Sequence, residues 1–110
     1  MKTSTPILRD LRRVPNPTSN PVAGLVSDTL AHYGLSQAAA AKAMNVSPGV
    51  ICDVIKGRKA VSTDLALRIE RCLGISADFI LRSQAHYHYC VAFHSKSPRI
   101  EREVTPLVTA

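Results

Sequence analysis

Several basic side chains fall close together in the sequence, where they could neutralise phosphate groups. Lys56, Arg58 and Lys59 lie within four positions of one another, and Lys42 precedes them. Exposed basic residues occur on any protein surface, but three so close together favour a contact surface for phosphates. With the net charge of +6, they indicate a polyanionic partner without deciding which one.

The segment around these residues is predicted to form two short helices joined by a tight turn. Ser36 is a good N-cap for an alanine-rich helix over residues 37–44. Asn45 then interrupts this helix, because asparagine is one of the few residues besides glycine that tolerate a positive φ. Ser47-Pro48 begins a second helix, whose apolar stripe continues almost to Gly57.

Two such helices have the physical plan of a helix-turn-helix, in which the first helix crosses the DNA backbone and the second enters the major groove. Ala41 is small where the helices would cross, and Asn45 suits the turn. The apolar residues that must complete the core are Val46, Ile51 and Val54. The sequence therefore predicts a DNA-facing motif from Ser36 to about Gly57.

The apolar spacing predicts three further helices. One begins near Val22 and ends before Gly34, another follows the N-cap Ser62 and ends at Gly74, and the last follows Ser76. Residues 86–93, HYHYCVAF, are compatible with either a continued helix or a short strand. The residues predicted to lie in the core are Leu25, Ala41, Ile51, Val54, Leu65, Ile69 and Leu73.

We therefore expect an all-α protein with five helices and flexible tails at both ends. Residues 1–20 are rich in proline and basic groups and are expected to form a flexible arm. Residues 21–94 would form the helix-turn-helix DNA-binding domain. Residues 95–110, which include Pro98 and Pro106, are expected to be a loose C-terminal tail.

The run LSQAAAAKAMNVSPGVICDVIKGRKAVSTDLALRIERCLGISADFIL, residues 35–81, resembles the Xre-type regulators, and within them the HigA-type antitoxins of bacterial toxin–antitoxin modules. The resemblance extends over residues 19–89. It implies a compact five-helix, lambda-repressor-like helix-turn-helix domain. It also implies a protein that is usually a homodimer, binds a palindromic operator in double-stranded DNA and holds a ribonuclease-type toxin inactive.

The resemblance also implies roles for single residues. Gln37 matches the family's phosphate-contacting glutamine, and Ser47 matches a position at the recognition-helix N-terminus, where free N–H groups favour a phosphate. Helix capping and solvation are the alternative roles of both. The residues expected to contact DNA are Gln37, Lys42, Ser47, Pro48, Gly49, Val50, Cys52, Asp53, Lys56, Arg58 and Lys59.

The base-reading positions depart from the family pattern. The family usually has Gln, Ser, Arg or Asn there, whereas this chain has Pro48, Gly49, Val50, Cys52 and Asp53. Asp53 could accept a hydrogen bond from cytosine N4, and Val50 could touch a thymine methyl group. Few side chains are therefore available to contact base edges directly, and DNA shape and phosphate contacts would carry more of the specificity.

Three functions stay open at this point. The first is an operator-binding repressor that is the antitoxin of its own operon. The second is an Xre-type regulator without a toxin partner. The third is a protein-interaction module that keeps the fold but has lost strong DNA recognition, as the Pro48-Gly49-Val50 run would allow.

An enzyme is not expected, because no phosphate loop, catalytic carboxylate pair or nucleophile elbow is present. Cys52 and Cys72 lie on apolar helical stripes, which predict burial. His86, Cys90 and His94 are spaced by four residues, but we expect neither a metal nor a cofactor. The odd cysteine number and the lack of a signal peptide or an 18-residue apolar run predict a cytoplasmic protein.

A dimer is expected, because one short recognition helix contacts only a few base pairs. The last helix and its extension are the favoured dimer surface, unless their apolar residues close the core of the monomer. The residues of this surface are Ile80, Tyr87, Tyr89, Val91 and Phe93.

Overall fold

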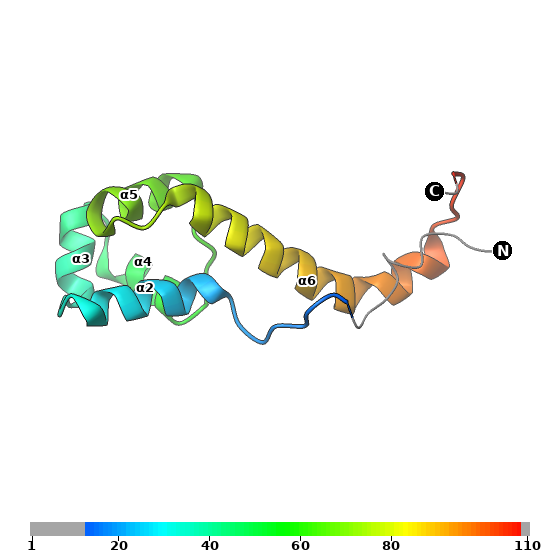
Figure 1. Ribbon diagram of the computed structural model, residues 1–110, viewed down its shortest axis with the longest axis horizontal. Helices are drawn as coiled ribbons and strands as arrows, with labels where there is room; N and C mark the ends of the chain where they lie inside the picture. The colour runs from blue at the N-terminus through cyan, green and yellow to red at the C-terminus, as the bar shows by residue number, and fades with distance from the viewer. Residues whose placement is uncertain (1–12, 109–110) are drawn as a thin grey trace. The chain divides into compact units, whose positions relative to one another are not determined.

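The computed structural model describes residues 13–108, in which it contains five α-helices and no strand (Figure 1). The helices are α2 (Pro21–His32), α3 (Gln37–Met44), α4 (Pro48–Ile55), α5 (Thr63–Leu73) and α6 (Ala77–Glu103). The expected all-α fold with five helices is confirmed for this part of the chain. Residues 1–12 of the expected arm lie outside the described residues.

The helices belong to two compact units. Residues 19–87 form the first unit, which holds α2 to α5 and the start of α6, while residues 88–108 and 13–18 belong to the second. Within the second unit, Nε2 of His94 lies 2.7 Å from the carbonyl oxygen of Val14. Because α6 passes from one unit into the other, the expected domain boundaries after residues 20 and 94 stay predictions.

Side-chain caps begin three of the helices where the sequence predicts them, whereas the predicted N-cap Ser47 of α4 makes no side-chain capping bond. The Oγ atom of Ser36 accepts from the backbone N–H of Ala39 at 3.0 Å, and Oγ of Ser62 accepts from Leu65 at 3.1 Å. These bonds satisfy N–H groups that the first turn of a helix leaves unpaired. Ser76 caps α6 in the same way, through the N–H of Phe79 at 3.2 Å.

The left-handed residues that end two of the helices are also confirmed. Asn45 follows α3 with a φ of 59°, and Gly74 follows α5 with a φ of 75°. The N–H of Asn45 bonds the carbonyl of Lys42 at 3.1 Å. A positive φ reverses the chain within a few residues, and this allows α4 to begin immediately after α3.

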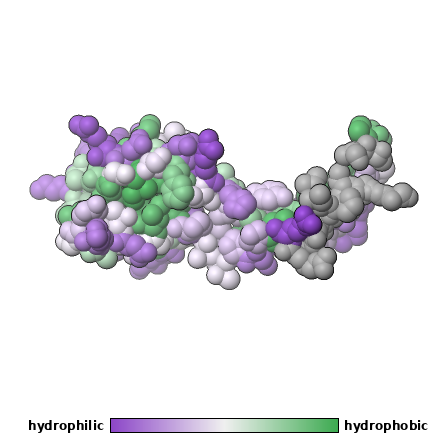
Figure 2. Space-filling model, in the orientation of Figure 1, coloured by the Kyte–Doolittle hydropathy of each residue, from purple (hydrophilic) through white to green (hydrophobic). Residues whose placement is uncertain are grey.

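Apolar side chains from every helix form the core of the first unit. α4 packs against α2 and α3, and α3 also packs against α5. The buried residues are Val22, Val26, Leu30, Ala40, Ala41, Met44, Ile51, Val54, Val61, Leu65, Ala66, Ile69, Ala77 and Ile80. Of the predicted core residues, Leu25 and Leu73 are only partly buried at its edge. Figure 2 shows hydrophilic residues around this unit and a hydrophobic area on its visible face.

One buried polar side chain ties α6 to the rest of the first unit. Gln84 is 7% exposed, and its amide bonds both backbone groups of Val61. Its Oε1 also accepts from Nδ2 of Asn20 at 3.4 Å. Asn20 is the N-cap of α2, where Oδ1 accepts from the N–H of Val22 at 3.0 Å. These bonds connect the start of α2, the link before α5 and α6.

The expected loose tail over residues 95–110 is wrong for residues 95–103, because α6 continues through Pro98 to Glu103. The strand alternative for residues 86–93 is likewise not realised, since they are helical. Pro98 cannot donate to the carbonyl four residues earlier, but it removes only one hydrogen bond from a long helix. Its neighbours include good helix formers, and Arg99 lies 3.9 Å from the Glu103 carboxylate one turn later.

The cysteines are placed differently from the expectation. Cys52 and Cys72 are half-buried rather than buried, and Cys90 is the buried one. All three are free thiols. Cys52 lies at the border between the buried stripe of α4 and its outer face, which explains its partial exposure. Across residues 13–108, no group of His, Cys, Asp or Glu could hold a metal ion, and no helix is long and apolar enough to cross a membrane.

Candidate nucleic-acid interface

The outer face of α4 is a row of four residues at helical spacing. Gly49, Cys52, Asp53 and Lys56 follow one another at intervals of three, one and three residues, which places them on one side of a helix. The opposite side carries the buried pair Ile51 and Val54. Packing of this inner side against α2 and α3 leaves Gly49 and Lys56 exposed and Cys52 and Asp53 half-buried on the outer face.

Val50 lies apart from this row. It is half-buried and packs against the core, and it lines a hollow of about 270 Å³ together with Val46, Val54 and Leu65. A side chain in this position shares its surface between the core and solvent. Its predicted contact with a thymine methyl group is not tested by the structure and stays a prediction.

Gly49 adds no side chain to the row, but there is room for one. A Cβ atom at this position would meet only Oγ of Ser47, at 4.0 Å. This separation is an ordinary van der Waals contact. Position 49 can therefore accept a Cβ atom without repacking α4.

Asp53 forms ion pairs with two basic residues of the segment that follows α4. Its Oδ1 lies 3.7 Å from Nη1 of Arg58, and its Oδ2 lies 3.9 Å from Nζ of Lys59. The backbone supports the same arrangement, since the carbonyl of Asp53 accepts from the N–H of Arg58 at 2.8 Å and of Lys59 at 3.4 Å. Gly57, with a φ of 71°, turns the chain back toward the helix. We call Asp53, Arg58 and Lys59 the charge cluster.

The two serines of the motif differ in what their hydroxyl groups do. Ser36 caps α3, whereas Ser47 has an extended backbone at the N-cap of α4 and makes no side-chain capping bond to it. Capping therefore does not account for the Ser47 hydroxyl. Gln37 is exposed at the first position of α3, and Lys42 is exposed near its end.

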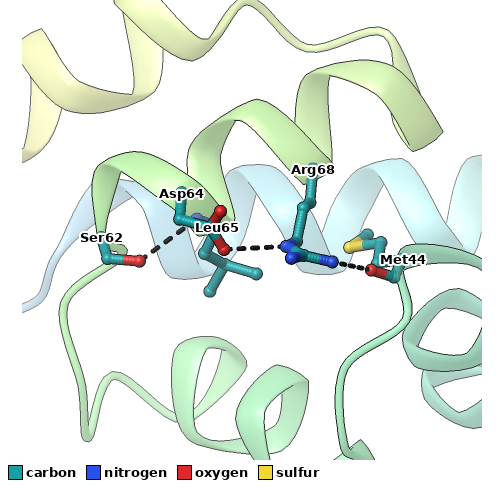
Figure 3. A network of polar contacts seen from close by, with 5 residues as sticks. All are labelled: Met44, Ser62, Asp64, Leu65 and Arg68. Carbon is teal, nitrogen blue, oxygen red and sulfur yellow. Dashed lines mark hydrogen bonds and ion pairs between the residues drawn. The ribbon is translucent and has the colours of Figure 1, made fainter.

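An arginine on α5 fixes the end of the helix that precedes the turn. Nη1 of Arg68 donates to the carbonyl of Met44 at 2.9 Å, and Nε bonds Oδ2 of Asp64 at 2.8 Å (Figure 3). A cation here neutralises the negative end of the α3 dipole and satisfies one of its free carbonyls. Sequence reasoning missed this contact, because Met44 and Arg68 are 24 residues apart.

Two comparisons with known proteins agree with this geometry. Residues 29–80 match the helix-turn-helix family, which covers α3, α4 and α5. The chain is also 34% identical over 80 residues to virulence-associated protein I of Dichelobacter nodosus, spanning 73% of this chain and 74% of that protein. The chain belongs to the Xre-type helix-turn-helix family.

Solved structures place this Xre-type protein in the HigA-type subgroup. The antitoxin HigA of Pseudomonas aeruginosa, solved with the higBA promoter, has a TM-score of 0.74 and 29% identity over 84% of this chain and all of that one. A HigA-family addiction module antidote protein from Coxiella burnetii has a TM-score of 0.71 and 25% identity, over 84% of this chain and 99% of that one. The predicted family and subgroup are confirmed.

The Xre-type protein thus brings six of the eleven predicted contact residues to one region and turns Val50 toward the core. Gly49, Cys52, Asp53 and Lys56 share the outer face of α4, and the charge cluster joins them at its end. Val50 packs inward. The pairing of Asp53 with the two cations was missed, although a carboxylate five and six residues before Arg58 and Lys59, with a glycine between them, was a usable signal.

Proposed function

We propose that this protein is a sequence-specific DNA-binding repressor and the antitoxin of a toxin–antitoxin module that represses its own operon. The observation that carries the proposal is the outward row of α4, held by a tight turn on a helix-turn-helix core. It is supported by the likeness to a HigA antitoxin solved with promoter DNA. None of the related proteins named above carries the name of an enzyme.

In this proposal, α4 enters the major groove and α3 lies across the DNA backbone. The row of Gly49, Cys52 and Asp53 would face base edges. Lys42, Lys56 and the cations of the charge cluster would contact phosphates, which position the protein without distinguishing bases. Gln37 and Ser47, at the first turns of α3 and α4, would bind phosphates through side chains and free N–H groups.

The protein would act as a homodimer, with two copies of α4 in major grooves about 34 Å apart on a palindromic operator. The expected dimer surface needs one correction, because Ile80 is fully buried in the core of the first unit. Tyr89 and Val91 are exposed, and Tyr87 and Phe93 are half-buried. Of the five residues expected at this surface, Tyr89 and Val91 are the ones that the structure exposes on α6.

A ribonuclease-type toxin would be the protein partner, and the complex would act in the cytoplasm. The neighbouring gene distinguishes this antitoxin role from a regulator without a toxin. A small basic ribonuclease-like reading frame beside this one, whose growth arrest is relieved by co-expression of this chain, supports the antitoxin. A product that arrests growth regardless of this chain would contradict it.

Fluorescence anisotropy tests the DNA-binding part directly. One labelled duplex contains the DNA upstream of this reading frame, and the other has the same length and composition in scrambled order. At about 150 mM salt we expect the upstream duplex to bind on the order of 10³-fold more tightly. Equal binding of both duplexes would overturn the proposed function and favour the protein-interaction module.

A further inference from the structure

Asp53 presents a physical problem on a surface proposed to meet DNA. Its carboxylate lies on the outer row of α4, where it would approach a polyanion. It also lies within 4.0 Å of Arg58 and Lys59, two of the cations best placed to attract phosphates. A neutral residue at position 53 would remove both obstacles to DNA binding. Because this carboxylate would repel DNA phosphates, we looked for a contact to DNA that a carboxylate makes and a neutral side chain does not.

The chemistry of base edges supplies such a function. In the major groove, a carboxylate can accept a hydrogen bond from an exocyclic amino group, above all N4 of cytosine. The other groups there include the acceptors O6 and N7 of guanine and O4 of thymine, which repel it. A carboxylate thus separates bases more sharply than a neutral amide, which can donate as well as accept.

The charge cluster couples the contact between Asp53 and a base to the phosphate contacts of Arg58 and Lys59. The side chain of Asp53 is 27% exposed, whereas those of Arg58 and Lys59 are 61% and 74% exposed. At 3.7 and 3.9 Å, with the cations in solvent, the two ion pairs are weak and exchange easily. DNA phosphates can therefore replace Asp53 as the ion-pair partner of Arg58 and Lys59. The Asp53 carboxylate is then left without a cation.

We propose that Asp53 is a specificity-determining residue that penalises binding to the wrong DNA sequence. This inference rests on the proposed function. In the free protein, the Asp53 carboxylate is neutralised by Arg58 and Lys59. On DNA, phosphates replace it at both cations. A base with an amino group in reach then satisfies the released carboxylate, whereas any other base leaves a desolvated anion facing acceptors.

Replacement of the carboxylate should leave the local structure in place. The backbone carbonyl of Asp53, not its side chain, bonds the N–H groups of Arg58 and Lys59. Asp53→Asn keeps the shape of the residue and removes one negative charge. The position of the following segment should persist, so that a change in DNA binding reports on charge.

The test compares wild type and Asp53→Asn on the upstream and scrambled duplexes across a range of salt concentrations. We expect Asp53→Asn to bind scrambled DNA about fivefold more tightly, because no ion pair has to be broken and no carboxylate is left facing base acceptors. Affinity for the upstream duplex should stay equal or fall. The ratio of the two affinities should therefore drop by at least about fivefold.

Asp78→Asn is the matched control. It removes the same charge and breaks a similar exposed pair, in which Oδ1 of Asp78 lies 3.0 Å from Nε of Arg82 on α6. We expect this variant to keep the wild-type ratio. In the background of Arg58→Ala with Lys59→Ala no ion pair has to be broken, so Asp53→Asn should change the affinity for scrambled DNA by a different factor than it does in the wild type, and the effects should be non-additive.

The outcomes separate the two claims. A wild-type protein without preference for the upstream duplex overturns the proposed function and this inference with it. A wild-type preference that Asp53→Asn fully retains overturns this inference alone. Equal weakening of both duplexes by Asp53→Asn also overturns it, because Asp53 would then only position the cations. An equal effect of Asp78→Asn would assign the change to net charge and likewise contradict the inference.

Discussion

The side chain of Gln84 pairs with the peptide groups of Val61 as a neighbouring β-strand would. Its Nε2 donates to the carbonyl of Val61 at 2.8 Å, and its Oε1 accepts from the N–H of Val61 at 2.7 Å. Both residues are buried, so water cannot replace these bonds. The α6 helix is thereby joined to the link between α4 and α5 by polar groups as well as by apolar packing.

Gln84→Ala should lower the free energy of unfolding by about 2–4 kcal/mol, because it leaves a buried donor and a buried acceptor unpaired. Urea denaturation followed by circular dichroism measures the change. Gln37→Ala is the control, because Gln37 is exposed, and should change the stability by less than about 0.5 kcal/mol. Equal stability of both variants would show that water reaches Val61.

Two glycine positions should respond to alanine in opposite directions. Gly24 lies inside α2 and Gly34 follows it with a φ of 65°, and an added Cβ meets nothing within 4 Å at either site. Gly24→Ala should raise the melting temperature, since it gains about 0.5–1 kcal/mol of helix propensity. Gly34→Ala should lose about 1 kcal/mol, because a left-handed φ strains alanine. A shift of the same sign for both would contradict the assigned backbone.

Arg68→Ala should destabilise the fold by about 1 kcal/mol, since the carbonyl of Met44 loses a charged donor at the end of α3. Asp64→Asn is the comparison, because it removes only the other half of an ion pair whose carboxylate side chain is 75% exposed. Its effect should stay below about 0.5 kcal/mol. Thermal unfolding at equal ionic strength gives both values. Equal losses would mean that the bond to Met44 contributes nothing.

Arg58→Ala combined with Lys59→Ala should weaken binding to upstream and scrambled DNA by similar factors, because phosphate contacts do not distinguish bases. The salt slope should shrink by up to about two units. Arg82→Ala with Arg99→Ala removes the same charge from α6 and should leave the slope nearly unchanged. Unchanged affinity and slope in the first variant would remove both residues from the interface.

Light scattering at micromolar concentration should give the mass of a dimer, since a palindromic operator is matched by two-fold symmetry. Titration with the upstream duplex should end at two chains per site. A monomer mass that persists with one chain bound per duplex would contradict this expectation.

Local signals in the sequence predicted the helices well, but they could not predict contacts between residues far apart in the sequence. The caps at Ser36 and Ser62 and the left-handed Asn45 act within a few residues, so their chemistry is visible in the sequence itself. The bond from Arg68 to Met44 joins residues 24 apart, and that from Gln84 to Val61 joins residues 23 apart. No short-range pattern marks such pairs before the helices are packed.

Pro98 and Asp53 show two further limits of sequence reasoning. Proline opposes a helix locally, but one missing hydrogen bond did not outweigh a long helix with favourable neighbours. The position of Asp53 on α4 could be predicted, and its predicted contact with a base followed from that position and from its carboxylate. Its partners could not, because they depend on how Gly57 turns the chain back.

Gly49 lies at the N-terminal end of the row proposed to meet base edges, and a Cβ atom there would meet only the Ser47 hydroxyl within 4 Å. A single codon change there can install a new hydrogen-bonding group while the core beneath α4 stays as it is. In the proposed function, target choice and fold stability would thus depend on different residues. Gene duplication followed by substitution at position 49 would let two copies diverge toward separate operators without either passing through an unstable intermediate.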